Sequence, residues 1–503
     1  MTMRFDFDNS YARDLEGLYV PWKAAEVPEP KLVRLNHALA AELGLDAQAL
    51  DSPEGALIFS GNKMPEGTAT IAQAYAGHQF GGFSPQLGDG RALLLGEVID
   101  KNGKRRDIAF KGSGRTPFSR GGDGKAALGP VLREYLIGEA MHALGIPTTR
   151  ALAAVTTGEI VRRERNLPGA VLTRVAASHV RVGTFQFLAA RGDEARLKKL
   201  ADYVIGRHYP EIKAAGQPYF ELLRALCDRQ ASLIARWMNV GFIHGVMNTD
   251  NMTLSGETID YGPCAFMDRY DPKTVFSSID EYGRYSYMNQ PPIANWNLAR
   301  FAEALLPLLA VESGGDQDKA IERAMEILGD FQQRYERHWL AGMRSKLGLV
   351  REDEGDFALA TDFLAGMEGQ AGGVGADFTL AFRRLADLAE GKGELSAFGL
   401  RKLYADTTAL EAWLPRWQAR AQSEGIAPEK QAAAMRAVNP VYIPRNRRVE
   451  EALAAATDLG DYKPFEQLLA VLQQPFDERV EFAAYATPAT VEEARGYQTF
   501  CGT

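Results

Sequence analysis

Two side chains with hard oxygen ligands lie close together in the stretch FIHGVMNTDNMTLSGETIDYG, residues 242–262. Asn251 offers an amide oxygen, and Asp260 offers a carboxylate after a short, hairpin-like spacer. Such ligands suit Mg²⁺ that already carries phosphate oxygens. The stretch therefore predicts a metal site that serves a phosphate-bearing ligand.

The same stretch departs from kinase chemistry at one position. In kinases a catalytic-loop asparagine and the aspartate of a D-F-G triplet hold the metal, and Asp260-Tyr261-Gly262 resembles that triplet. Aligned on Asn251, the segment reads H-G-V where protein kinases have H-R-D and small-molecule kinases have H-G-D. Val246 therefore occupies the position of the catalytic base, and a valine cannot accept a proton. Asp250 is the nearest spare carboxylate, and it either takes this role or caps a turn.

A lysine and a glutamate that could position phosphates lie closer to the N-terminus. Lys111 ends a predicted strand, and Glu134 lies in the predicted helix that follows. Protein kinases place nucleotide phosphates with such a pair. A surface lysine and a solvated glutamate would give the same pattern. The interpretation therefore depends on the presence of the Asp260 motif in the same chain.

Glycine-rich segments and two arginines complete the set of candidate nucleotide ligands. Glycine-rich backbone can turn its N–H groups toward anionic oxygens, and arginines add charge-assisted contacts. One short loop, 88–91, precedes Lys111 and a richer loop, 112–124, follows it, which departs from an ordinary kinase. Arg174 and Arg181 either contribute to this site or pair with surface carboxylates.

Strands and one helix are predicted to carry these residues. The predicted strands are 92–99, 107–111, 151–155, 159–163 and 170–175. The first two form a hairpin across the DKNGK turn, and a Thr-Thr-Gly turn separates the third from the fourth. Pro130 stands in the first turn of a helix through VLREYLIGEAMHAL, which Gly145 and Pro147 end.

The second part of the chain is predicted to be mainly helical. Its clearest helical segments are 219–239, 297–309 and 319–340, and residues 366–375 read as a flexible loop. A hairpin, a helix and further strands followed by a helical half indicate an α+β, protein-kinase-like bilobed fold, with a β-rich N-terminal lobe and a larger helical C-terminal lobe.

Composition limits the class of partner. The 503 residues carry a net charge of −8, and the pI near 5.6 argues against a general nucleic-acid binder. The N-terminal residues do not form a secretory signal and no apolar run is long enough to span a membrane, so a cytoplasmic protein is expected. The three cysteines have no metal-ligand spacing, and Cys227 is interpreted as a packed apolar residue of a helix.

Long ordered blocks of the chain closely resemble the selenoprotein O family, also called the YdiU family, of protein adenylyltransferases with a pseudokinase fold. The blocks are YAGHQFGGFSPQLGDGRALLLGE, KGSGRTPFSRGGDGKAALGPVLREYL, SHVRVGTFQF, FIHGVMNTDNMTLSGETIDYGP and NPVYIPRNR, spread over residues 75–447. The resemblance implies transfer of AMP from ATP to Ser, Thr or Tyr hydroxyls of proteins, with pyrophosphate as the leaving group. ATP would bind in a reversed orientation, and UTP and Mn²⁺ are alternatives to ATP and Mg²⁺.

The same resemblance implies a role for each candidate residue. Asp250 would be the proton acceptor, Asn251 and Asp260 would hold the metal, and Glu134 would orient Lys111. The residues that would contact nucleotide are Gly88, Gly90, Arg91, Lys111, Asp123, Gly124, Arg174, Arg181 and Asp260. The corresponding domains are an N-terminal extension at 1–75, an N-lobe at 76–180, a C-lobe at 181–350, and a helical C-terminal extension with a redox tail at 351–503.

Two cysteines suggest a redox hypothesis. Cys264 follows Asp260 in the segment that corresponds to a kinase activation loop, and Cys501 lies in the final Cys-Gly-Thr. Both thiols are expected to be accessible, and they are either unrelated or form a reversible disulfide. Some eukaryotic members of the family carry selenocysteine near the same C-terminal position, which favours the pair.

Three functions remain open at this point. Nucleotidyl transfer is the first, a nucleotide-binding scaffold without catalysis is the second, and phosphoryl transfer is the third. Val246 argues against the third, and the presence of both Asn251 and Asp260 argues against the second.

Overall fold

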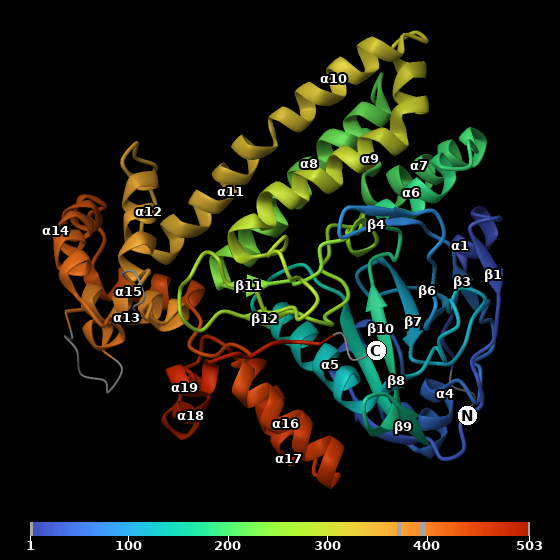
Figure 1. The fold of residues 1–503 in the computed structure, drawn as a ribbon, viewed down its shortest axis with the longest axis horizontal. Coiled ribbons are helices and arrows are strands. Elements are labelled where there is room, and N and C mark those ends of the chain that lie inside the picture. Colours follow the sequence, from blue (N-terminus) through green and yellow to red (C-terminus); the bar gives the residue numbers. More distant parts are fainter. Residues whose placement is uncertain (1–3, 370–373, 392–398, 501–503) are drawn as a thin grey trace.

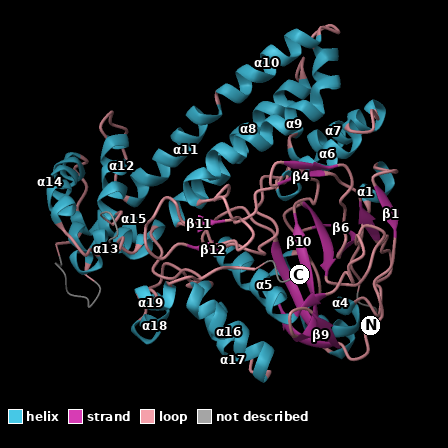
Figure 2. Ribbon diagram, viewed as in Figure 1, coloured by secondary structure: helices cyan, strands magenta, loops and turns pink. Residues whose placement is uncertain are grey.

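The chain combines an antiparallel sheet in its N-terminal part with a largely helical C-terminal part, as the sequence predicts. A computed structural model describes residues 4–369, 374–391 and 399–500. Figure 1 shows the sheet and its flanking helices on one side, with the long helices extending away from them. Figure 2 shows how strands gather in one region and helices in the others.

The main sheet has eight strands, and every pairing in it is antiparallel. The strand order is β1-β3-β6-β7-β10-β9-β2, and β8 pairs with β10. The strands are β1 Tyr19–Pro21, β2 Lys31–Leu35, β3 Ile71–Gln73, β6 Ala92–Ile99, β7 Arg105–Lys111, β8 Ala126–Ala127, β9 Arg150–Arg162 and β10 Asn166–Ala176. Residues before position 76 thus supply three strands to this sheet.

Both faces of the sheet are covered, which explains the nearly continuous hydrophobic runs of its strands. Side chains alternate between the faces along a strand. In β6, Leu94 packs into the larger hydrophobic core together with α5 (Leu128–Ala143). Leu93 and Leu95 pack into a second core together with α4 (Pro53–Ser60). The predicted hairpin of β6 and β7 is confirmed, and Lys111 is the last residue of β7.

Two predicted elements differ from the structure. The Thr-Thr-Gly segment does not separate two strands, because β9 runs through it as one strand of 13 residues. Gly158 adopts φ 76° there, and the register shift opposite Pro168 and Ala170 absorbs the extra residues as a bulge. The predicted helix 319–340 is two helices, α10 (Gln317–Gly329) and α11 (Phe331–Lys346), that separate at Gly329 and Asp330, where the glycine disfavours helix.

Helices make up most of the chain after β10, and shorter helices precede β6. The helices other than α4 and α5 are α1 Ser10–Asp14, α2 His37–Glu42, α3 Ala47–Leu50, α6 Val182–Ala189, α7 Glu194–His208, α8 Pro218–Val240, α9 Gln290–Glu312, α10 Gln317–Gly329, α11 Phe331–Lys346, α12 Asp356–Met367, α13 Phe378–Ala389, α14 Thr408–Ser423, α15 Pro428–Val438, α16 Asn446–Leu459, α17 Lys463–Leu472, α18 Ala483–Ala486 and α19 Val491–Ala494. Of the loop predicted at 366–375, residues 366 and 367 end α12, and residues 370–373 lie outside the described part of the chain.

Several short elements lie between these helices and the sheet. Two small antiparallel pairs stand apart from the main sheet, namely β4 (Gly77–Gln79) with β5 (Gly82–Ser84) and β11 (Phe242–Ile243) with β12 (Ala265–Phe266). A turn of 3₁₀ helix at Thr249–Asn251 follows β11. Across residues 4–369, 374–391 and 399–500, no helix has the length and apolar character to cross a membrane.

Candidate active site

One large cavity gathers the predicted nucleotide, metal and catalytic residues. Its volume is about 1000 Å³, and its walls come from the sheet, α5, the 3₁₀ turn and residues near position 500. The predicted residues that line it are Gly88, Gly90, Arg91, Lys111, Asp123, Gly124, Glu134, Arg174, Arg181, Asp250, Asn251 and Asp260. Chain segments that are far apart in the sequence therefore meet at one site, and the roles of these residues stay predictions.

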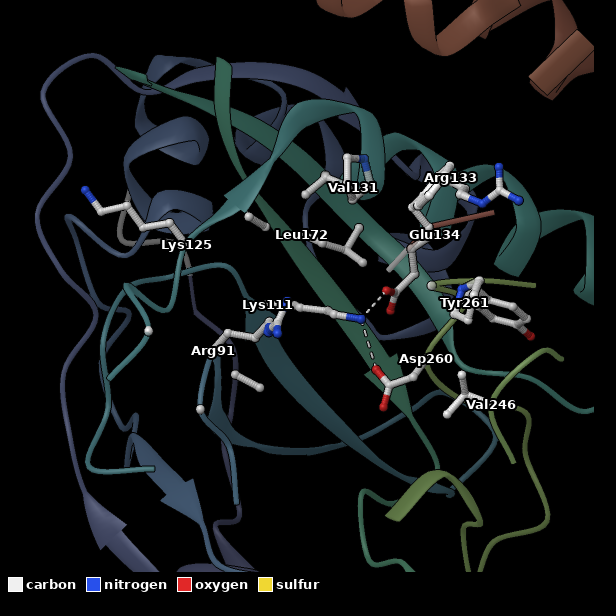
Figure 3. A pocket seen from close by; sticks show the side chains of 18 of the residues that line it. Arg91, Lys111, Lys125, Val131, Arg133, Glu134, Leu172, Val246, Asp260 and Tyr261 are labelled. Atoms are coloured by element: carbon white, nitrogen blue, oxygen red, sulfur yellow. Dashed lines mark hydrogen bonds and ion pairs between the residues drawn. The ribbon is translucent and has the colours of Figure 1, made fainter. Parts of the chain in front are cut away.

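Lys111 is the centre of an ion-pair network at the bottom of the cavity. Its Nζ donates to Glu134 Oε2 at 2.5 Å and to Asp260 Oδ1 at 3.0 Å, as Figure 3 shows. The contact arises because β7 ends at Lys111 and α5 crosses this end of the sheet with Glu134 buried. Burial opposes the charge of Lys111, yet Asp260 and Glu134 raise the pKa of this lysine above its ordinary value.

Two arginines add to the positive charge around Asp260. Arg174 Nη1 donates to Asp260 Oδ1 at 2.7 Å and to Glu134 Oε1 at 3.2 Å. Arg181 Nη1 lies 3.8 Å from Asp260 Oδ2 and donates to the carbonyl of Asp250 at 3.1 Å. Burial alone would raise the pKa of Asp260, but Lys111 and the two arginines hold it well below its usual value. Asp260 is therefore ionised at neutral pH.

Asp260 and Asn251 suit a divalent cation by the chemistry of their oxygens. Lys111 and Arg174 share Oδ1 of Asp260, whereas Arg181 lies 3.8 Å from Oδ2 and no described residue donates a hydrogen bond to it, so Oδ2 remains open to a metal. Asn251 Nδ2 donates to the carbonyl of Val246 at 2.9 Å, which leaves its amide oxygen as a ligand. The described residues hold no group of three or more His, Cys, Asp or Glu suited to a metal. A cation bound here would therefore take its other ligands from phosphate and water.

Asp250 has one carboxylate oxygen that is buried and has no hydrogen-bond partner in the described part of the chain. That atom is Oδ1, and the other oxygen, Oδ2, accepts from Gln79 Nε2 at 3.5 Å. Burial raises the pKa of Asp250 to about 6, although the nearby Arg181 opposes this shift. Val246 also lines the cavity (Figure 3). The position that holds the base in kinases is thus apolar, and the Asp250 carboxylate lines the same cavity.

The glycine-rich segment 112–124 forms a loop at the cavity, as expected. Gly124 has φ 68°, and a Cβ there would lie 2.1 Å from the carbonyl oxygen of Gly114, so this position requires glycine. Asp123 pairs with Arg163 at 2.8 Å and also accepts from the Lys125 N–H at 3.0 Å. Arg91 Nη1 is buried and has no partner among the described residues. The loop therefore lines the cavity through Arg120, Asp123 and Gly124, and Arg91 adds a further cationic group from outside it.

Sequence reasoning missed a buried histidine that holds Arg174 in place. His179 Nδ1 lies 2.9 Å from Asp107 Oδ2, and Arg174 Nε donates to His179 Nε2 at 3.2 Å. His179 is thus neutral and positions Arg174 against Asp260. Its only signal in the sequence is its place in SHVRVGTFQF, where Arg181 was the residue singled out. Sequence reasoning also missed Tyr75, whose ring centre lies 4.4 Å from the guanidinium carbon of Arg181.

The expectation that Cys264 is accessible is wrong. The side chain is fully buried, and burial raises the pKa of its thiol to about 12. Cys501 lies outside the described residues, so its pairing with Cys264 stays a prediction. Nearby, Thr499 donates through Oγ1 to the carbonyl of Pro263 at 2.7 Å. Cys227 is fully buried, as its interpretation as a packed apolar residue requires.

Comparisons with known proteins cover the whole site. The model of the family described as protein adenylyltransferase SelO matches residues 1–473. The chain is 62% identical over 502 residues to a protein nucleotidyltransferase YdiU of Cereibacter sphaeroides strain KD131, with 100% of both chains covered. It is 58% identical over 504 residues to a relative with the same name from Rhodopseudomonas palustris strain HaA2, again with 100% of both covered. A further relative with that name, from Rhizobium johnstonii, is 58% identical over 99% of this chain and 97% of its own.

Proposed function

The chain belongs to the protein adenylyltransferase SelO family, and on that premise we propose that it is a nucleotidyltransferase that moves AMP from ATP onto hydroxyl side chains of proteins. The acceptors are Ser, Thr or Tyr residues, and pyrophosphate is released. The relatives named above are protein nucleotidyltransferases, which supports a nucleotide co-substrate and a protein acceptor.

One observation carries the proposal. Cations and a carboxylate with a free oxygen share one cavity, while the base position of a kinase is a valine. Lys111, Arg174 and Arg181 provide positive charge for a triphosphate, and Asp250 Oδ1 has no other hydrogen-bond partner in the described chain. This arrangement supports attack by a hydroxyl close to Asp250.

The chemical step follows from these positions. The acceptor oxygen attacks the α-phosphorus of ATP, and a new O–P bond forms. The bond from the α-phosphorus to the oxygen that bridges to the β-phosphorus breaks, and pyrophosphate leaves with that electron pair. Asp250 takes the hydroxyl proton, while Lys111 and Arg174 stabilise the charge that develops on the phosphates.

A divalent cation fits the same site. Asn251 and Asp260 would hold Mg²⁺ or Mn²⁺, which when bound neutralises phosphate charge. Glu134 fixes Lys111 and Arg174 through separate carboxylate oxygens, so both cations keep their positions before nucleotide arrives. The Gly88, Gly90 and Asp123–Gly124 segments would face the phosphates.

The finer description of the fold is part of the same proposal. Family membership and the Lys111, Glu134 and Asp260 network support a kinase-like core with lobes at 76–180 and 181–350. The segment at 1–75 adds three strands to the sheet of the first lobe, and the helical part at 351–503 would extend the second lobe and contributes residues to the cavity wall. ATP would lie in the orientation that exposes its α-phosphate to the acceptor.

Labelled nucleotides test the reaction directly. The chain is incubated with Mg²⁺, a mixture of acceptor proteins, and ATP that carries its label at either the α- or the γ-phosphate. Label from the α-position on protein is expected, and stable label from the γ-position would instead identify a phosphotransferase. Tight ATP binding without either label would identify a nucleotide-binding scaffold. The same assay with α-labelled UTP and with Mn²⁺ decides which nucleotide and metal are preferred.

A further inference from the structure

The small hairpin of β4 and β5 contacts three consecutive residues, Asn248–Asp250, at the start of the 3₁₀ turn. The His78 N–H donates to Thr249 Oγ1 at 2.7 Å, and the Phe80 N–H donates to Asn248 Oδ1 at 3.0 Å. Gln79 Nε2, between them, donates to Asp250 Oδ2 at 3.5 Å. The hairpin lies about 170 positions away in sequence, and its contacts with this turn are polar and specific.

Tight packing fixes the hairpin against Asp250. Thr249 Oγ1 donates to Gln186 Oε1 at 2.6 Å, and Gln186 Nε2 lies 2.8 Å from His78 Nδ1, so α6 joins the hairpin to the turn. A Cβ added at Gly77 would lie 2.7 Å from Asp250 Oδ1. The strand backbone therefore passes directly beside the oxygen that has no partner, and no side chain at position 77 can block it.

The hairpin also brings an exposed aromatic side chain to the edge of the cavity. Phe80 lies at the turn of the hairpin with φ 52°, remains 39% exposed and lines the cavity. Its ring packs edge-on against Tyr285 at 5.2 Å, and the Tyr285 hydroxyl donates to Asn248 Oδ1 at 2.7 Å. Ile279 is 53% exposed and lines the same cavity. Exposed apolar side chains beside a reactive group favour a partner that covers them.

The cavity lining combines two kinds of side chain. Lys111, Arg174 and Arg181 are cationic and suited to a triphosphate, whereas Phe80 and Ile279 are exposed and apolar. Asp250 is the residue whose carboxylate would meet an acceptor hydroxyl. A segment of the acceptor protein that presents a hydroxyl to Asp250 would therefore cover Phe80.

We propose that the β4–β5 hairpin is the acceptor side of the active site. Gln79 is a positioning residue that holds Oδ2 of Asp250 and so fixes the orientation of the carboxylate toward the acceptor hydroxyl. Phe80 and Ile279 form an apolar seat for an extended acceptor segment, and they select a hydroxyl residue with an apolar neighbour. This inference rests on the proposed function, because it concerns the acceptor of that same reaction.

Variants of Gln79 test the positioning role. Gln79→Met keeps the length of the side chain and removes its donor. We expect kcat for α-label transfer to fall about tenfold, because one charge-assisted hydrogen bond is lost, while KM for acceptor and the Kd for ATP stay within twofold. Gln79→Glu places a second carboxylate beside Asp250 and is expected to lower kcat further. A kcat of Gln79→Met equal to the parental value, or a loss that appears only as a lower Tm, would overturn the role of Gln79.

Variants of Phe80 test the seat with two probe peptides. Each peptide is alanine-rich and has a single serine, which is flanked by leucine in one and by aspartate in the other. The parental protein is expected to modify the leucine peptide with at least roughly fivefold higher kcat/KM, because an apolar side chain would bury against the seat. Phe80→Ala should raise KM for the leucine peptide and remove the preference, with ATP affinity unchanged.

Phe83 provides the matched control. It lies on the same hairpin with 44% exposure but does not line the cavity, so Phe83→Ala should keep the preference. An equal preference in the parental protein and Phe80→Ala, or no modification of the leucine peptide by a chain that labels intact proteins, would overturn the seat. A parental chain that binds ATP but transfers α-label to no acceptor would instead overturn the proposed function itself.

Discussion

Two buried networks of arginine and carboxylate groups in this molecule have similar composition and different surroundings. The first joins Lys111 and Arg174 to Glu134 and Asp260 at the cavity. The second lies in the helical part, where Arg445 Nη1 donates to Asp268 Oδ1 at 2.6 Å and to Asp377 Oδ2 at 2.7 Å. Both networks hold basic and acidic side chains that are largely removed from water.

The two networks differ in their access to the large cavity. The Asp260 side chain is 24% exposed and faces the large cavity, whereas the Arg445 side chain is 1% exposed. Arg445, Asp268 and Asp377 do not line that cavity. Arg445 also donates to the carbonyl of Ala486 at 3.0 Å, so this network joins the starts of α13 and α16 to α18. A buried ion pair alone therefore does not identify a functional site, and its position beside an open cavity does.

The largest expected effect comes from the carboxylate at the centre of the first network. Asp260→Asn keeps the shape of the side chain and tolerates φ 64° at this position, but it removes the charge. We expect α-label transfer to fall roughly 10⁴-fold, because the anionic metal ligand and the charged partner of Lys111 are both lost. Single-turnover transfer and calorimetry of Mg²⁺-dependent ATP binding check this. Unchanged metal dependence would remove Asp260 from the metal site.

A substitution of Asp250 tests whether the cavity contains a catalytic base as well as a nucleotide-binding site. Asp250→Asn is expected to lower transfer roughly 10³-fold, as the loss of a general base does. Because the cation network is intact, ATP binding should stay within a fewfold of the parental affinity. The measurement compares the two quantities under conditions where chemistry limits the rate. Transfer at the parental rate would assign the proton acceptor elsewhere.

The second network should respond in stability and not in chemistry. Arg445→Met leaves Asp268 and Asp377 buried without their cation, which is expected to lower the free energy of unfolding by about 3 kcal/mol. Denaturant unfolding measures this change, and the transfer rate per folded molecule should stay within twofold. A large loss of rate in the folded fraction would contradict the distinction between the two networks.

A buried lysine without a carboxylate partner in the described chain provides the smallest expected effect. Lys346 Nζ lies 4.1 Å from the ring centre of Phe382, and burial lowers the pKa of Lys346 to about 7. An unfolded lysine keeps its proton up to a pH near 10, so the unfolded state binds more protons above pH 7 and stability rises with pH there. We expect a gain of about 2 kcal/mol between pH 7 and 9 from this group.

Lys346→Met supplies the control for that pH dependence. The variant has no titrating group at this position, so the gain between pH 7 and 9 should disappear, and stability at pH 7 should rise. Chemical unfolding of both proteins at several pH values measures the difference. The same slope in both proteins would assign the pH dependence to other groups.

Local patterns predicted much of the fold and of the site. Hydrophobic runs and turn residues predicted the β6–β7 hairpin and α5, and these two elements carry Lys111 and Glu134. The hydrogen bond between Gln79 and Asp250 was not predictable in this way, because the two residues lie 171 positions apart and no periodicity links them. The buried position of Cys264 likewise depends on packing that the sequence pattern does not contain.

The strand order has a consequence for how the sheet assembles. Its centre consists of two local hairpins, β6 with β7 and β9 with β10, which can form as soon as their own residues are available. The edge strand β2 pairs with β9, and Lys31 and Thr156 in that pairing are 125 positions apart. During synthesis β2 therefore leaves the ribosome long before its partner exists, and this edge closes late, since distant contacts form slowly.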